Sequence, residues 1–129
     1  AQLDELRGYR DMAIGGWENG VAATVVHYIN DVLQDMGKIG TDDYSFADHA
    51  KHWGELKGFA LGLQFNPNSP LSDDDFELFH SLVGDAPVLT GEAALADYTD
   101  ALIEARTVLG DAYGFDADNL GDENGENGW

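Results

Sequence analysis

The sequence predicts an all-α protein: an antiparallel bundle of about four helices within residues 1–114, followed by an acidic, flexible tail at 115–129. Apolar residues recur at steps of three and four along most of the chain, which is the spacing of one helix face. No segment shows the apolar–polar alternation of a half-buried strand. Helix-capping and turn-forming residues separate the periodic segments. The 129 residues are enough for one hydrophobic core.

The first periodic segment runs from the start of the chain to about Gly37. Gly15 and Gly16 interrupt it, and glycine weakens a helix, so we expect one long helix with a weak point or two nearly collinear helices. The stripe along this segment consists of Leu3, Leu6, Arg10, Ile14, Trp17, Val21, Val25, Tyr28, Ile29, Val32 and Met36.

Three further helices come after it, each with a start signal. Ser45 is expected to cap a helix over about 46–64, which "FNPNSP" ends because proline and asparagine favour turns. Ser72 precedes three aspartates, which suit the positive end of a helix dipole, and so starts a short third helix. Thr90 is expected to cap the fourth. Its apolar face contains Leu95, Tyr98, Leu102, Arg106, Leu109 and Tyr113.

Composition excludes several classes of function. The chain has 25 acidic and 6 basic side chains, and its formal charge of −19 repels phosphate backbones and anionic membranes, so we expect no nucleic-acid partner. No apolar run approaches the ~20 residues of a membrane span. Because there is no cysteine, disulfides, thiolate zinc sites and iron–sulfur clusters are excluded. The acidity is typical of a salty environment, a cation site or a basic partner, and equally of solubility alone.

The second helix carries candidate metal ligands at intervals of three residues. His49, His52 and Glu55 share one side of it, and two imidazoles with a carboxylate can supply part of a zinc or iron site. The spacing matches neither a metalloprotease helix nor the paired Glu-x-x-His of a di-iron bundle. The alternative is that His49 is a hydrogen-bonded core residue beside Trp53, with His52 and Glu55 in solvent.

Three charged residues lie on stripes that are otherwise apolar. Arg10 and Glu18 interrupt the face of the first helix, and Arg106 that of the fourth. A buried charge needs a partner, so we expect a network of Arg10, Glu18 and Arg106 near His49 and Glu55, with Glu18 as a further candidate metal ligand. The alternative is that the long side chains reach solvent from the ends of the stripes.

Glycines recur at every fourth position of the second helix, at Gly54, Gly58 and Gly62. Three helical glycines cost about 2 to 3 kcal/mol relative to alanine, and close contact with another backbone would offset this cost. We therefore expect the helix to be central, with polar chemistry on one side and another packed layer on the other. The alternative is a mobile helix with exposed glycines.

The acidic tail has some features of a calcium-binding loop. Asp116, Asp118 and Asp122 alternate with other residues as oxygen ligands do. The match is incomplete, since Leu120 replaces a ligand and Asn127 stands where a bidentate glutamate belongs. A calcium site and a plain solvated tail are both open.

The segments "VVHYINDVLQDM" and "YSFADHAKHWGELKGFALGLQFNP" resemble an uncharacterised group of bacterial surface and periplasmic proteins related to the imelysin-like family. The resemblance runs from about Tyr9 to Gly114. It implies an all-helical, exported protein located in the periplasm or at the cell surface. Several family members are associated with iron uptake, and their proposed His-x-x-Glu metal motif falls here on His52 and Glu55. The fuller Gly-x-His-x-x-Glu form is not matched, because Ala50 replaces the glycine, which weakens a peptidase assignment.

Imelysin-like domains are longer than this chain, so the resemblance covers the C-terminal part of one. The sequence also begins directly in helical rhythm at Ala1, as expected of a processed, trimmed or truncated product. We therefore expect the N-terminal portion of the same domain, or a separate partner chain, to pack on the first and second helices.

The sequence leaves three functional hypotheses. No nucleophile elbow, phosphate-binding loop or dinucleotide fingerprint is present, which removes the enzyme classes most easily recognised from motifs. The first hypothesis is an exported imelysin-like protein that takes up or senses iron or another divalent metal through His49, His52, Glu55 and Glu18. The second is a structural or interaction subunit of a cell-surface assembly without catalysis. The third is a metallopeptidase. We favour binding or assembly over an enzyme.

Overall fold

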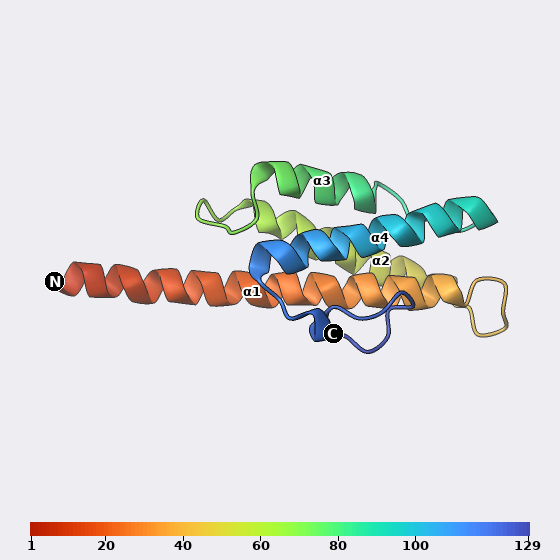
Figure 1. Ribbon diagram of the computed structural model, residues 1–129, viewed down its shortest axis with the longest axis horizontal. Helices are drawn as coiled ribbons and strands as arrows, with labels where there is room; N and C mark the ends of the chain where they lie inside the picture. Colours follow the sequence, from red (N-terminus) through yellow and green to blue (C-terminus); the bar gives the residue numbers. More distant parts are fainter.

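The computed structural model describes all 129 residues and confirms the all-α class. Four α-helices follow one another: α1 (Gln2–Gly37), α2 (Phe46–Leu61), α3 (Asp73–Val83) and α4 (Glu92–Tyr113). Two short 3₁₀ helices, η1 (Gly62–Gln64) and η2 (Ala117–Asn119), follow α2 and α4. Consecutive helices run in opposite directions, so the molecule is an antiparallel bundle (Figure 1).

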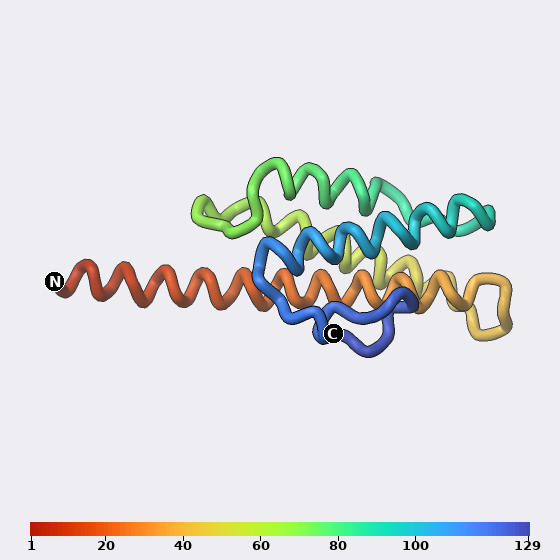
Figure 2. The backbone as a smooth tube through the Cα atoms, in the orientation of Figure 1, coloured from red at the N-terminus to blue at the C-terminus, as the bar shows by residue number.

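Helix α1 is a single uninterrupted helix of 36 residues, and Gly15 and Gly16 do not break it. Its N-terminal half extends well beyond the other three helices (Figure 2). Nearly all residues before Glu18 are exposed there, including the apolar Leu3 and Leu6. Only the second half of the predicted stripe is therefore buried within this chain.

Two of the three predicted helix caps are confirmed. Ser45 Oγ accepts a hydrogen bond from the Asp48 amide, and Ser72 Oγ from the Asp75 amide, so both hydroxyls satisfy free donors of the first turn. The prediction that Thr90 caps α4 is wrong. The cap is Gly91, which makes no side-chain bond and has a φ of 91°, a backbone turn that glycine adopts without strain.

The core lies where the second half of α1 meets α2 and α4, and α3 packs against α4. Figure 1 shows all four helices overlapping only along this half of α1. The largest fully buried apolar side chains are Phe79, Ile29, Leu56, Leu102, Leu109, Val25, Val26, Val32 and Val83. None of the helices is long and apolar enough to cross a membrane.

The segment after Gly114, for which the sequence predicts a flexible tail, is packed on the bundle. Asn30 donates hydrogen bonds through Nδ2 to the carbonyls of Leu120 and Trp129 at 3.0 and 2.8 Å, and Gln34 donates to that of Gly125 at 2.7 Å. Gly125 has a φ of 77°, and a Cβ added there would lie 2.3 Å from the Asn30 carbonyl oxygen. The tail is held by these polar side chains of α1 and by Phe115 and Leu120, which pack against the core. The hydrogen bonds join residues far apart in the sequence, so no local pattern indicated them.

Candidate functional site

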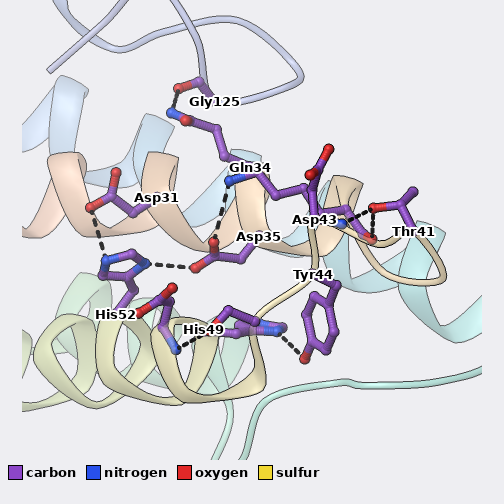
Figure 3. Close-up of polar contacts among 12 residues, drawn as sticks. Asp31, Gln34, Asp35, Thr41, Asp43, Tyr44, His49, His52 and Gly125 are labelled. Atoms are coloured by element: carbon purple, nitrogen blue, oxygen red, sulfur yellow. Dashed lines mark hydrogen bonds and ion pairs between the residues drawn. The ribbon is translucent and has the colours of Figure 1, made fainter.

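A cluster of histidines and carboxylates lies between α1 and α2. His27, Asp31 and Asp35 follow one another at intervals of four on α1 and so share a face of the helix, and His52 reaches them from α2. His52 Nδ1 lies 2.6 Å from Asp35 Oδ2, and its Nε2 lies 3.8 Å from Asp31 Oδ2. His27 Nε2 lies 3.2 Å from the same Asp31 oxygen. Figure 3 shows the His52 ring held between the two aspartates.

His49 is a hydrogen-bonded core residue, which is the alternative to a metal ligand that the sequence left open. Its side chain is fully buried, and Nδ1 lies 3.0 Å from the Tyr44 hydroxyl (Figure 3). Nε2 is buried without a hydrogen-bond partner. Burial lowers the pKa of His49 below its usual 6.5, because the charged imidazolium is poorly solvated there. At neutral pH the ring is therefore uncharged.

Glu55 lies beside Tyr28 at the edge of this cluster. One of its carboxylate oxygens, Oε2, is buried without a hydrogen-bond partner. A hydrogen bond to Glu55, followed by burial and by the negative charges of Glu55 and Asp31, raises the pKa of the Tyr28 hydroxyl. Glu55 is thus engaged with α1, not free in solvent.

The predicted metal ligands do not come together. His49 is turned toward Tyr44, His52 is held by Asp35, and Glu18 is bound by residues of the α2–α3 connection and α4. In the structure no group of three or more histidines and carboxylates is arranged to hold a metal ion. His49, His52, Glu55 and Glu18 are therefore not gathered at one point in this arrangement.

Glu18 occupies a separate buried site on α1. Its carboxylate accepts hydrogen bonds from Asn66 Nδ2 at 2.5 Å, from the Tyr113 hydroxyl at 2.7 Å and from the Ser69 hydroxyl. Only 6% of the residue is exposed. Burial is also the main reason that the pKa of Tyr113 is raised. All three donors are neutral, so the negative charge of Glu18 is solvated by dipoles and has no counter-ion.

The predicted network of Arg10, Glu18 and Arg106 is wrong. Arg10 is exposed and pairs with its neighbour Asp11 at 2.6 Å, because this part of α1 projects beyond the bundle. Arg106 is buried, as predicted, but it donates to Asn30 Oδ1 at 2.6 Å and to the Asp122 carbonyl at 3.0 Å. Burial lowers the pKa of this guanidinium below its usual value.

The row of glycines along α2 and the start of η1 faces open space. A Cβ added at Gly54, Gly58 or Gly62 would meet no atom within 4 Å, so the close backbone contact that we predicted is not made within this chain. Gly58 and Gly62 instead line a groove of about 790 Å³ between α1 and the end of α2, which we call the α1–α2 groove. Its apolar lining includes Ile14, Trp17, Val21, Phe59, Leu63 and Phe65, and Glu18 also contributes to it.

Asp116, Asp118 and Asp122, the candidate calcium ligands, are not gathered at one point in the structure. Asp122 accepts hydrogen bonds from the amides of Asn124 and Glu126 and from Asn127 Nδ2, each at 2.9 Å. These bonds, chiefly that from Glu126, lower the pKa of Asp122. Asp116 and Asp118 are exposed, and the three carboxylates form no group suited to a metal ion. Asp122 organises the turn of the tail itself.

Sequence reasoning missed several residues that organise these sites. Asp31 and Asp35 could have been found from the His27–Asp31–Asp35 row at four-residue spacing. Asn30 could have been noted as a polar residue beside the buried Ile29. The donors to Glu18 had no local signal, because Asn66 and Ser69 lie in a turn-rich connection.

Comparisons with known proteins give no family assignment. No protein-family model matches the chain, and neither curated proteins nor solved structures match it significantly.

Proposed function

We propose that this chain is a helical interaction module of an imelysin-like assembly at the bacterial surface or in the periplasm, and that the α1–α2 groove holds a helix. We assign that helix to the N-terminal portion of the imelysin-like domain, carried on the same polypeptide or on a separate partner chain. The observation that supports this function best is the open row of Gly54, Gly58 and Gly62.

The energetics of the groove favour an occupant. Gly54 and Gly58 lie inside α2 and together cost about 2 kcal/mol relative to alanine, and no close backbone contact within this chain offsets that cost. A second helix packed against the row could approach unusually closely, because no Cβ stands between the two backbones. The apolar lining also favours an occupant. Trp17 and Phe65 are each 79% exposed, and large exposed apolar patches typically mark interfaces.

The projecting half of α1 provides a second part of the same surface. Residues 2–17 form a rod about 24 Å long, at about 1.5 Å per residue. Its apolar Leu3, Leu6, Ile14 and Trp17 are exposed on it. A partner that lies along the groove can continue along this rod, which would bury both apolar surfaces at once.

The proposal is tested by selecting helical binders. A display library of amphipathic helices of about 20 residues, within the range of bundle helices, is selected against the purified chain. We expect binders whose affinity falls at least tenfold on Gly58→Leu, which fills the groove. The control Ala93→Leu adds similar bulk at an exposed position of α4 and should leave binding unchanged.

Two results would overturn this assignment. The first is that no selected helix is sensitive to Gly58→Leu. The second is a concentration-dependent dimer of the chain, measured by sedimentation equilibrium and abolished by Gly58→Leu, which would identify the occupant as a second copy. The charge of −19 on each chain opposes such pairing.

Metal binding is a second candidate, and the histidine–carboxylate cluster is the observation that favours it. The contact of His52 Nδ1 with Asp35 is the arrangement that orients many metal-binding histidines, and it directs Nε2 toward Asp31. His27 is half exposed and lies 3.2 Å from the same Asp31 oxygen. Uptake or sensing of iron or zinc would predict binding of Zn²⁺ or Fe²⁺ in calorimetry that is lost on His52→Ala and retained on His49→Gln. Absence of binding to the unmodified chain would remove this candidate.

A further inference from the structure

The lining of the α1–α2 groove includes a buried carboxylate that several hydrogen bonds hold in place. Glu18 lines the groove with only 6% of its surface exposed, and donors from two other parts of the chain converge on its carboxylate. Asn66 and Ser69 reach it from the connection after η1, and Tyr113 from the end of α4. Side chains separated by up to 95 residues thus fix one carboxylate beside an apolar groove.

This carboxylate lacks a cation. None of the ion pairs in the molecule involves Glu18. The two arginines on the same predicted stripes are engaged elsewhere, Arg10 with Asp11 and Arg106 with Asn30. Neutral donors stabilise a carboxylate only in part, so a buried one without a counter-ion retains a large desolvation cost.

An occupant of the groove would make this cost larger. Apolar side chains laid over Trp17 and Phe65 would displace the remaining water beside Glu18 and lower the local dielectric constant. In that environment an uncompensated charge is penalised more strongly, and an opposite charge is attracted more strongly, than in water. An occupant that presents only apolar groups would therefore bind poorly.

We propose that the helix held in the α1–α2 groove carries one basic side chain that pairs with Glu18. This inference rests on the proposed function of the groove and specifies the chemistry of its partner. Arginine suits the position better than lysine, since its planar guanidinium offers several donors to the carboxylate and stacks on aromatic rings such as Trp17. Gly58 and Gly62 set the closest approach of the two helices, so the basic residue occupies one defined position of the partner stripe.

The test uses the helices selected against the unmodified chain, and it changes charge without changing shape. We expect arginine or lysine to be enriched at a single position among binders that are sensitive to Gly58→Leu. Replacing that arginine by citrulline in the synthetic peptide should weaken binding at least about tenfold, as expected for a close buried charge pair. On Glu18→Gln the arginine and citrulline peptides should bind alike. The matched control Glu104→Gln neutralises an exposed carboxylate of α4 and should preserve the difference.

The outcomes separate this inference from the proposed function. Binders that depend on Gly58 but show no basic position, or that bind equally with arginine and citrulline, would overturn the pairing and leave the groove assignment standing. Binders insensitive to Gly58→Leu would remove the groove assignment itself. The citrulline comparison on the unmodified chain decides between these outcomes even where Glu18→Gln folds poorly, because it leaves the protein unaltered.

Discussion

At the scale of single residues, Asn30 connects three parts of the molecule. Its Oδ1 accepts from Arg106, and its Nδ2 donates to the carbonyls of Leu120 and Trp129, so α1, α4 and the tail meet at one amide. The residue is 1% exposed, and no other side chain of α1 accepts a hydrogen bond from the Arg106 guanidinium. Its polar groups are fully used.

Asn30→Ala should lower the free energy of unfolding by about 2 to 4 kcal/mol, because the Arg106 guanidinium and two carbonyls lose a buried partner. Urea unfolding followed by circular dichroism measures this change. Asn19→Ala, at an exposed position of the same helix, serves as the control and should be neutral or slightly stabilising. A small effect at Asn30 would mean that the tail is not held by this side chain.

His49 makes stability depend on pH. Burial lowers its pKa in the folded state below the 6.5 of the unfolded chain, so on acidification the unfolded state takes up a proton first. The stability associated with the neutral ring is fully present above about pH 6.5 and is lost as pH falls toward the folded pKa. His49→Gln removes this titration. We expect the unmodified chain to lose stability relative to the variant as the pH is lowered from above to below about 6.5 in urea unfolding, and a constant difference would contradict the assignment.

At the scale of elements, local signals in the sequence predicted most of the helix starts correctly. Ser45 and Ser72 marked two starts correctly, since a cap needs only residues a few positions apart. The prediction for Thr90 was wrong because the neighbouring Gly91, with its positive φ, occupies the N-cap position of α4. The sites were harder to predict, since Asn30 and Arg106 lie 76 positions apart and Glu18 meets Asn66 across 48. Such pairs result from how helices pack, which no local pattern encodes.

The glycines of α2 and of the tail should respond in opposite ways to alanine. Gly58→Ala should stabilise the isolated chain by about 0.5 to 1 kcal/mol, because alanine is the better helix former and its Cβ meets no atom within 4 Å. Gly125→Ala should destabilise it, because the new Cβ would collide with the Asn30 carbonyl at a φ of 77°. Thermal unfolding of both variants checks the pair. Destabilisation by Gly58→Ala would show that the groove is already filled.

The projecting half of α1 should be the least protected helical segment. An isolated helix of this length is marginal in water, and residues 2–17 have almost no tertiary contacts to stabilise them. Hydrogen–deuterium exchange should therefore be fast for these amides and slow for those around the buried Ile29. A groove-binding helix should slow exchange in the projecting half. Equal protection along all of α1 in the free chain would indicate that another surface already covers it.

At the scale of the whole molecule, negative charge opposes the compact state. The chain has a net charge of −19, and few of its carboxylates are paired with a lysine or arginine. The basic residues that form such ion pairs are Arg7, Arg10, Lys38 and Lys57. Folding brings the remaining carboxylates closer together than they are in the unfolded chain. Asp97, Asp100 and Glu104 illustrate this, since they lie exposed at intervals of three and four on α4.

Salt should therefore raise the thermal stability. The screening length falls from about 30 Å at 0.01 M salt to about 3 Å at 1 M, so added NaCl removes most of the repulsion between exposed carboxylates. We expect the unfolding temperature to rise steadily over this range. The double variant Asp100→Asn, Glu104→Gln should be more stable at low salt and should show a smaller rise, because it has two fewer repelling charges on one helix face. The exposed pair Thr107→Ser, Ala93→Ser leaves the charge unchanged and serves as the control. A salt response equal in both double variants would show that self-repulsion does not limit the stability of the bundle.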